Sequence, residues 1–380
     1  MLSSRLSRGT RRFSTTQFFD NAMAATKDVP RKAIIASGGF GLCGIPENCI
    51  TAMMEHGTQD LTWIKIDANV SDVGMGPLIK NNQINKLVTS YIGPSQAVFE
   101  NYYAGKLGLE LIPQGTLTEK MRCGGNGVPA FFTRTGLGTV VQKGGFPIRL
   151  MGQTGGIQQI SDPKPTMSIG GQTYIREKAI TVDYGFVKGH VADEDGNVSF
   201  NKSAVNFNMD VAKASRTSIV EVEEIVPRGS LKPEEIHLPH IYVDRVFKGT
   251  DYVKKIEMPT FSNPDGSLDF PWKGEAGRKR KVIASRAALE IDHGAYVNLG
   301  IGIPTVITNY LDESFKVTFQ SENGLLGLAG YPLRGDEEPD LINAGKESVT
   351  TTADGSFFSS SESFLQIRGG HLDVTCLGGF

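Results

Sequence analysis

The chain has 380 residues, enough for two domains of ordinary size, and 45 of them are glycine, well above the average share of about 7%. Its 39 basic and 41 acidic side chains give a formal net charge of −2, which argues against a general polyanion binder because such proteins carry a basic excess. No apolar run approaches the roughly 18 residues of a membrane span, and four cysteines in so long a chain do not make a disulfide framework.

The amino end differs from the rest of the chain. Residues 1–19 contain four arginines, several serines and threonines, and no acidic residue. Such a start is typical of a mitochondrial transit peptide, and the sequence Arg-Arg-Phe-Ser favours cleavage after Phe13. We therefore expect a protein of the mitochondrial matrix, where thiols stay reduced. The alternative is a disordered basic tail that carries no targeting signal.

The first predicted strand covers residues 33–37 and enters the glycine-rich loop 38–46, after which apolar residues recur at helical spacing. Pro46 suits the start of a helix, where its missing N–H costs nothing. The loop also satisfies the G-x-G-x-x-G fingerprint of dinucleotide sites. Because no acidic residue closes a confirming second strand with certainty, an NAD-dependent oxidoreductase remains a remote alternative.

The same plan occurs again near the other end of the chain. Residues 295–299 form a predicted strand that enters Gly300-Ile301-Gly302-Ile303-Pro304, and a helical pattern follows. In both copies the next predicted strand ends near an acidic residue, Asp67 in the first and Glu322 in the second. The repeat predicts two homologous open α/β halves, with ligands beyond the carboxyl ends of the strands.

The composition places a boundary between the halves. We expect the first half at 20–249, a surface linker rich in proline and glycine at 250–280, and the second half at 281–380. The basic run at 278–281 favours a solvated linker end over a nucleic-acid site. His237 and His240 lack the spacing and the nearby cysteines of a zinc site, so packing or surface roles are favoured.

Glu322 is the sharpest candidate for catalysis. It lies between a predicted strand and a glycine-rich turn in Ser321-Glu322-Asn323-Gly324. A carboxylate can act as a nucleophile that forms a covalent intermediate, and free amides at such a turn can stabilise an oxyanion. From the residues alone, an exposed glutamate in a turn is the simpler interpretation.

Four segments carry a resemblance to a known family: GGFGLCGIPEN, FQSENGLLG, DLINAGKESVT and ESFLQIRGGHLDVT. They resemble the class I (3-oxoacid) coenzyme A transferases, over about residues 17–380. Within that family the chain is similar to the mitochondrial members that fuse two bacterial-type subunits and use succinyl-CoA and a 3-keto acid. The resemblance implies two NagB/RpiA-like α/β halves and a homodimer that binds neither nucleic acid nor membrane.

The resemblance also implies roles for single residues. Glu322 is expected to attack the acyl-CoA thioester and to pass through a glutamyl-CoA thioester, in the breakdown of ketone bodies such as acetoacetate. No metal or other cofactor is expected, since CoA enters as part of a substrate. The expected substrate-binding residues are Gln114, Asn323 and Gly324, and the expected CoA-binding residues are Gly300, Ile301, Gly302, Ile303 and Lys346.

Two features depart from the family pattern. The first-half strand of the family usually ends in Asn-Asn-Ala-Gly, whereas here it ends in Ile66-Asp67-Ala68-Asn69, and an ionised Asp67 is expected to repel carboxylate substrates. The second half, at 281–380, is short, and we expect it to be incomplete. A non-catalytic, truncated relative that binds a full-length family member is therefore the alternative function.

Overall fold

The computed structural model describes residues 15–70, 72–152, 155–265, 274–312 and 314–378. The chain divides into two compact units. Unit 1 comprises residues up to 38, 45–200 and 208–252, and unit 2 comprises 39–44, 201–207 and 253 onward. Two short segments of the predicted first half, 39–44 and 201–207, therefore belong to the unit that contains the predicted second half.

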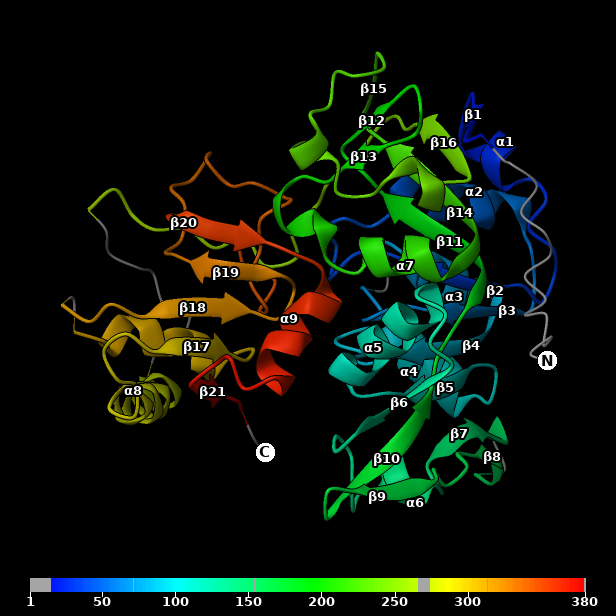
Figure 1. Ribbon diagram of the computed structural model, residues 1–380. Helices are drawn as coiled ribbons and strands as arrows, with labels where there is room; N and C mark the ends of the chain where they lie inside the picture. Colours follow the sequence, from blue (N-terminus) through cyan, green and yellow to red (C-terminus); the bar gives the residue numbers. More distant parts are fainter. Residues whose placement is uncertain (1–14, 71, 153–154, 266–273, 313, 379–380) are drawn as a thin grey trace. The chain divides into compact units, whose positions relative to one another are not determined.

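Unit 1 is built on an eight-stranded sheet in which every neighbouring pair is parallel (Figure 1). The strands in spatial order are β1 (Gln17–Phe19), β16 (Arg245–Lys248), β14 (Ser215–Val222), β11 (Val182–Lys188), β2 (Ile34–Ser37), β3 (Leu61–Ile64), β4 (Ile84–Thr89) and β5 (Gly108–Leu111). The predicted open α/β architecture is confirmed.

Helices cover the sheet of unit 1 because parallel strands bury both faces. The main core of one face joins strand residues such as Trp63 and Phe186 to α1 (Ala22–Thr26), α2 (Glu47–His56), α3 (Gly76–Lys80) and α4 (Gln96–Tyr103). Helices α5 (Gln114–Gly125) and α7 (Asn208–Ala214) contact each other, and α7 also contacts β11, on the side facing the viewer in Figure 1.

Smaller elements of unit 1 lie outside this sheet. They are β6 (Ala130–Thr133), α6 (Val140–Lys143), β7 (Pro147–Leu150), β8 (Ile157–Ile160), β9 (Thr166–Ile169), β10 (Gln172–Lys178), β12 (Val191–Asp193), β13 (Val198–Ser199), β15 (Glu224–Val226), η3 (Pro233–Glu235) and η4 (His240–Tyr242). They form small sheets in the orders β6-β10-β9, β13-β12-β15 and β7-β8.

Unit 2 is built on a mixed sheet in the order β20 (Thr351–Phe357), β19 (Leu325–Leu328), β18 (Thr318–Ser321), β17 (Tyr296–Leu299) and β21 (Val374–Cys376). Strand β17 is parallel to both of its neighbours, whereas β18, β19 and β20 pair antiparallel. The remaining elements are η2 (Lys202–Val205), α8 (Gly274–Ala288), η5 (Ile303–Tyr310) and α9 (Ser360–Arg368).

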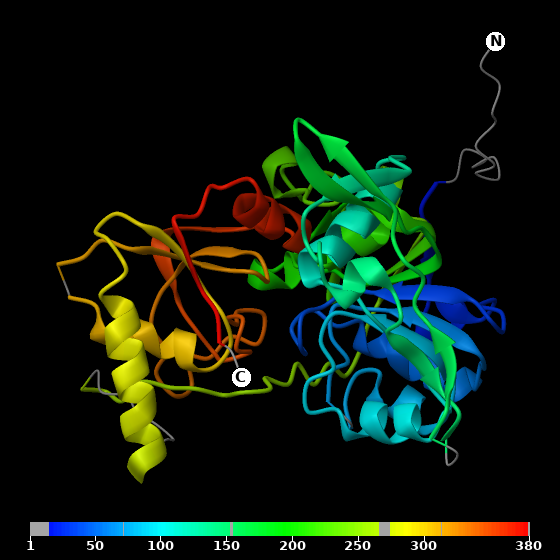
Figure 2. The same cartoon turned by 90° about the horizontal axis from the view of Figure 1, so that it is seen from below.

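Helix α8 differs from the prediction. It begins at Gly274, so the basic run at 278–281 lies within the helix and not at a linker end. Lysine and arginine are good helix formers, and Lys279 pairs with Glu275 one turn earlier at 2.9 Å. Helix α8, the long yellow helix in Figure 2, packs on η5. Its small residues Ala284 and Ala288 are buried in this contact, while Val282 is exposed.

The amino-terminal prediction also needs adjustment. Gln17–Phe19 form β1, which pairs with β16, so the end of the predicted segment 1–19 is part of the folded sheet. Cleavage after Phe13 would retain this strand. Residues 1–14 lie outside the described residues.

Candidate functional site

Glu322 lies on the tight turn that joins β18 to β19. The Gly324 N–H donates to the Ser321 carbonyl at 3.0 Å, and the Phe358 N–H donates to the Gly324 carbonyl at 3.1 Å. Gly324 has φ +107°, and a Cβ there would lie 2.0 Å from the Phe358 carbonyl oxygen. Only glycine fits at position 324, and its lack of a side chain allows the β20–α9 connection to pack closely against the turn.

The carboxyl group of Glu322 is poorly solvated. Its Oε2 atom is buried and has no hydrogen-bond partner among the described residues. Burial raises the pKa of Glu322 to about 7, against the opposing effects of its own backbone N–H and the Asn298 side chain. A carboxylate that has lost much of its hydration is a stronger nucleophile than one at the surface.

Buried polar side chains fix the strand that carries Glu322. Asn298 on β17 donates from Nδ2 to Oε1 of Gln320 at 2.7 Å, and Gln320 donates from Nε2 to Oγ of Ser363 on α9 at 2.6 Å. All three side chains are buried. The chain of amides therefore links β17, β18 and α9 behind the turn.

Unused hydrogen-bonding atoms surround the turn. Asn323 donates from Nδ2 to the Ile342 carbonyl at 2.7 Å. Its Oδ1, together with the hydroxyls of Ser321, Ser348 and Ser360, is buried without a hydrogen-bond partner among the described residues. Because buried polar atoms are normally satisfied, this cluster has the capacity to bind the oxygen atoms of a ligand.

Lys346 lies in a tight loop near this turn. The loop is closed by Asn343, which donates from Nδ2 to Glu347 at 2.8 Å, and Lys346 itself has φ +64°. Its Nζ pairs with Oε2 of Glu257 at 3.1 Å, and both side chains are only 8% exposed. Gly41 fits against this pair, since a Cβ there would lie 3.1 Å from atoms of both side chains.

A cavity of about 360 Å³ lies within unit 2. It is bounded by η5, by β18 and β19, and by the loop before Lys346. Of the predicted residues, Gly300–Ile303 precede the part of η5 that lines it, and Ser321 links it to the Glu322 turn. The lining residues are Ser262, Leu299, Thr305, Thr308, Asn309, Phe319, Gln320, Ser321, Leu328, Ala329, Gly330, Tyr331, Asn343, Ala344 and Val349.

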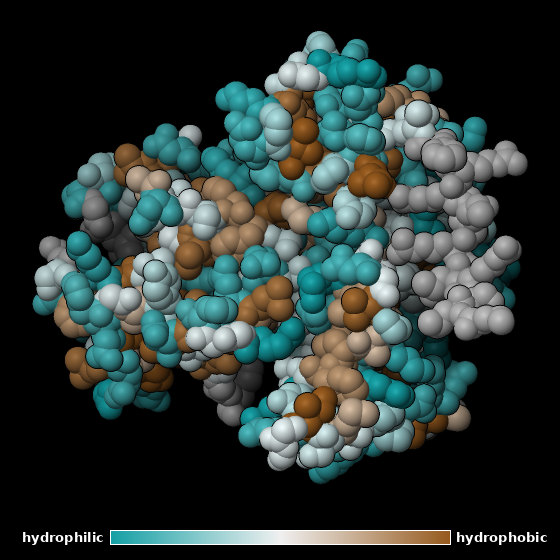
Figure 3. Space-filling model, in the orientation of Figure 1, coloured by the Kyte–Doolittle hydropathy of each residue, from teal (hydrophilic) through white to brown (hydrophobic). Residues whose placement is uncertain are grey.

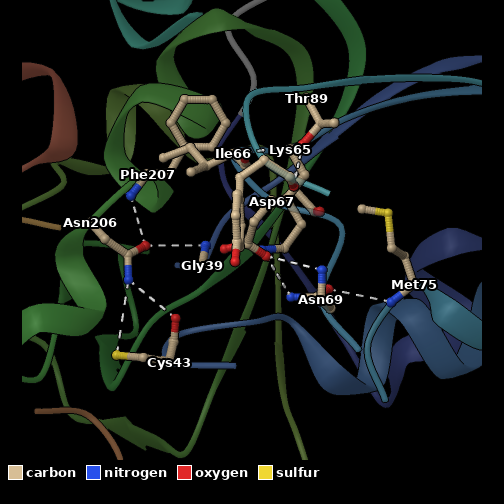
Figure 4. Close-up of polar contacts among 12 residues, drawn as sticks. Gly39, Cys43, Lys65, Ile66, Asp67, Asn69, Met75, Thr89, Asn206 and Phe207 are labelled. Carbon is tan, nitrogen blue, oxygen red and sulfur yellow. Dashed lines mark hydrogen bonds and ion pairs between the residues drawn. The ribbon is translucent and has the colours of Figure 1, made fainter. Parts of the chain in front are cut away.

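The first glycine loop, 39–44, is held by the second short segment of unit 2 (Figure 4). Asn206 accepts the Gly39 N–H at 3.1 Å and donates from Nδ2 to the Cys43 carbonyl at 3.1 Å. Ser203 donates from Oγ to the Asp340 carbonyl at 2.7 Å. These bonds connect the loop to the segment just before Lys346.

The helix that follows this loop does not offer a site for a dinucleotide pyrophosphate. At the start of α2, the N–H groups of Asn48 and Cys49 donate to the buried carboxylate of Glu221 at 3.3 and 2.8 Å. The protein thus supplies its own anion where a pyrophosphate would bind. This contact argues against the NAD-dependent alternative.

In unit 1, Gln114 is the first residue of α5, directly beyond the carboxyl end of β5. Its Nε2 and the hydroxyls of Ser90, Ser95 and Thr116 are buried without hydrogen-bond partners among the described residues. These atoms follow β4 and β5, which are neighbours in the sheet. Unit 1 therefore has its own group of unused polar atoms at the carboxyl edge of its sheet.

Asp67 does not carry the isolated negative charge that the sequence suggested. Its Oδ1 lies 3.3 Å from Nζ of Lys65 and accepts from both N and Nδ2 of Asn69 at 3.1 Å (Figure 4). The ion pair is buried, with side-chain exposures of 0% and 2%. The expected repulsion of carboxylate substrates is therefore offset by a lysine that the sequence analysis missed.

The sequence of the chain is similar to those of known proteins. A coenzyme A transferase family model matches residues 19–249 and 280–380. The chain is 46% identical over 369 residues to rat mitochondrial succinyl-CoA:3-ketoacid coenzyme A transferase 2A, covering 97% of this chain and 70% of the relative. It is 45% identical over 365 residues to human mitochondrial succinyl-CoA:3-ketoacid coenzyme A transferase 2, covering 95% and 69%. The chain belongs to the coenzyme A transferase family.

The fold agrees with this assignment. An acyl-CoA transferase (YdiF) from Escherichia coli O157:H7 superposes with a TM-score of 0.71 at 21% identity, over 96% of this chain and 69% of that one. The prediction of a coenzyme A transferase enzyme is thus confirmed at the level of the family.

Several side chains of this transferase were not singled out in the sequence. Asn298 and Gln320 support the Glu322 strand, Glu257 pairs with Lys346, and Lys65 pairs with Asp67. A polar residue inside an apolar strand was the available signal, as in Trp-Ile-Lys-Ile around Lys65. Glu257, in a region taken as a linker, gave no such signal.

The histidines of the transferase are engaged in local contacts. His237 accepts the Phe200 N–H at its Nδ1 at 2.9 Å, and Nδ1 of His240 lies 3.0 Å from the Asn197 oxygen. Within the described ranges, no group of three or more His, Cys, Asp or Glu residues is placed to hold a metal ion. The same ranges contain no helix long and apolar enough to cross a membrane.

Proposed function

We propose that this chain transfers coenzyme A from succinyl-CoA to a 3-oxo acid such as acetoacetate. The close mitochondrial relatives that carry this activity in their names support the proposal. The observation that carries it is the Glu322 carboxyl group, which is held on a glycine-dependent turn with one oxygen buried and its pKa raised to about 7.

The proposed reaction proceeds through covalent intermediates on Glu322. A carboxylate oxygen attacks the thioester carbonyl carbon, the C–S bond breaks, and an acyl-glutamyl anhydride and CoA thiolate form. The thiolate then attacks the glutamyl carbonyl, which gives a glutamyl-CoA thioester and releases the free acid. The acceptor carboxylate runs these steps in reverse and leaves as its CoA thioester, so the cycle needs no metal or other cofactor.

The remaining predicted residues take supporting roles in this proposal. Asn323 and Gly324 shape the turn beside the reacting carboxyl group, and Gln114 contacts the acyl group. Gly300, Ile301, Gly302, Ile303 and Lys346 bind CoA. Binding energy from the body of CoA, far from the reacting thioester, would then lower the barrier to the chemical step.

We further propose a homodimer in the mitochondrial matrix. The relatives named above are mitochondrial proteins. Apolar side chains are exposed on β8 and β9, where Ile157, Ile160, Met167 and Ile169 are each about half exposed. The face of the molecule in Figure 3 likewise shows apolar patches among hydrophilic side chains. Exposed apolar edge strands are usually covered by another chain.

The first test is the covalent intermediate. Incubation with acetoacetyl-CoA, rapid quenching and peptide mass spectrometry should show a CoA adduct on Glu322. Glu322→Gln should show none, whereas Glu337→Gln, a carboxylate change elsewhere in unit 2, should keep the adduct. A folded wild-type protein without any adduct at saturating acetoacetyl-CoA would contradict the proposal and fit the non-catalytic alternative.

A further inference from the structure

The end of β3 carries a buried ion pair on the core face of the sheet. Trp63, Lys65 and Asp67 alternate along the strand and its extension, and all three are buried. The two charged side chains are 0% and 2% exposed, and their closest N–O distance is 3.3 Å. Each buried charge compensates the other, and removing one partner leaves the other uncompensated.

The pair lies next to the unused polar atoms of unit 1. Backbone pairing continues past β3 and β4, where Asp67 bridges to Tyr91 and the Ser90 N–H donates to the Ile66 carbonyl at 2.9 Å. The Ile112 N–H donates to the Thr89 carbonyl at 2.9 Å, which places the start of α5 and Gln114 beside the end of β4. The ion pair and these atoms thus share one edge of the sheet.

The unused atoms suit oxygen-rich ligands. Gln114 offers an N–H donor from Nε2, and Ser90, Ser95 and Thr116 offer hydroxyls. A carboxylate bound there would experience the field of any net charge at the end of β3. With Lys65 and Asp67 both ionised, that net charge is zero.

We propose that Lys65 and Asp67 together determine the affinity of this transferase for carboxylate substrates. Lys65 acts as a positioning and compensating residue, since it orients the Asp67 carboxylate and cancels its charge at the edge where the acid binds. The inference rests on the proposed function, because it takes a free acid to be a substrate. It adds a specificity-determining pair that belongs to unit 1, whereas Glu322 belongs to unit 2.

Replacing the lysine alone tests the compensation. Lys65→Met keeps an unbranched side chain and leaves in place the two hydrogen bonds that Asn69 donates to Asp67. At pH 8 the KM for acetoacetate should rise about fivefold or more, as expected for an uncompensated charge in a partly buried site. The rate of adduct formation on Glu322 from acetoacetyl-CoA, at saturation, should stay within about twofold.

The double variant Lys65→Met/Asp67→Asn separates charge from packing. It removes both charges, so the KM for acetoacetate should return to within about twofold of wild type. Lys86→Met on the neighbouring strand removes a partly exposed lysine paired with Glu110 and serves as the matched control, with an unchanged KM. Thermal unfolding of each variant confirms that it is folded.

The outcomes distinguish this inference from the proposed function. If wild type forms no adduct, the proposed function fails. If wild type forms the adduct but Lys65→Met leaves the acetoacetate KM unchanged, the inference is overturned. The same holds if the double variant stays as impaired as Lys65→Met, because the effect is then one of packing and not of charge.

Discussion

At the scale of single residues, the surroundings of Glu322 disfavour its ionised form and make its carboxylate more reactive. One oxygen of its carboxyl group is buried without a hydrogen-bond partner among the described residues, and only Asn298 and a backbone N–H favour its charge. The pKa of about 7 means that a substantial fraction of the carboxyl group is ionised near neutral pH without being strongly stabilised. A nucleophile poised in this way is ionised when required and still reactive.

This pKa predicts an acid limit to the first chemical step. Below pH 7 Glu322 is protonated and cannot attack, so the rate of adduct formation should fall about tenfold per pH unit, and it should level off above pH 8. Quenched-flow mass spectrometry of the adduct across pH 5.5–8.5 measures this limb. A rate that stays constant down to pH 5.5 would show that the carboxyl group has an ordinary pKa.

The sequence identified Glu322 through its motif but not the atoms that tune it. Ser-Glu-Asn-Gly is local, and its glycine is required by a local φ. Asn298, Gln320 and Ser363 come from separate elements and meet only after folding. Asp67 was judged without Lys65, although only one residue lies between them, because a lysine in a strand is usually expected at the surface.

At the scale of elements, the start of α2 is held by a side chain from a strand that is distant in the sequence. Helix α2 begins at Glu47, and the residue before it, Pro46, provides no side-chain hydrogen bond to cap the helix. Glu221, on β14, accepts the two free N–H groups instead, and burial raises its pKa to about 7 while these N–H groups and Lys188 act in the opposite direction. A distant strand thus fixes the helix that follows loop 39–44.

Removing this carboxylate should loosen α2. Glu221→Ala leaves two buried N–H groups without their acceptor, so the free energy of unfolding should fall by about 2–4 kcal/mol at pH 5.5. In the native state Glu221 keeps a proton that the unfolded chain releases between about pH 4.5 and 7, so its contribution to stability falls as pH rises through that window. The loss should therefore be smaller at pH 8.

Urea unfolding followed by Trp63 fluorescence measures both values. Glu224→Ala, at an exposed position on β15, is the control and should change little. A loss that grows with pH would contradict the raised pKa.

The elements that the sequence analysis predicted are marked by local patterns. The strand–glycine loop–helix–strand repeat was correct in both copies, because apolar strands and proline-marked helix starts are local signals. Helix α8 was placed too late because its early turns are charged and solvent-exposed, and they lack the apolar residues by which helices are recognised.

At the scale of the whole molecule, β1 closes one edge of the large sheet with only three residues. Phe19 packs against the main core, and the Arg245 guanidinium lies 5.5 Å from its ring centroid. Without β1, strand β16 would become an open edge.

Two truncations test the role of this strand. A protein starting at Ser14 keeps β1, whereas one starting at Asp20 lacks it. The free energy of unfolding of the shorter protein should be about 1–2 kcal/mol lower, because the core surface that Phe19 covers becomes exposed. Differential scanning calorimetry should give a lower Tm for the shorter protein, and light scattering should show more aggregation. Equal Tm values would show that β1 does not support unit 1.

Unit 2 is assembled from segments that are far apart in the sequence, so its parts become available for folding at different times during synthesis. Loop 39–44 and segment 201–207 leave the ribosome early, but the partners they bond, such as Asp340, lie far along the chain. At about 5–20 residues per second, Ser203 waits roughly 7–27 s for Asp340, which lies 137 positions later. During synthesis, loop 39–44 can therefore bond to segment 201–207 as soon as Asn206 has emerged, whereas the rest of unit 2 is added only after the last residues of unit 1.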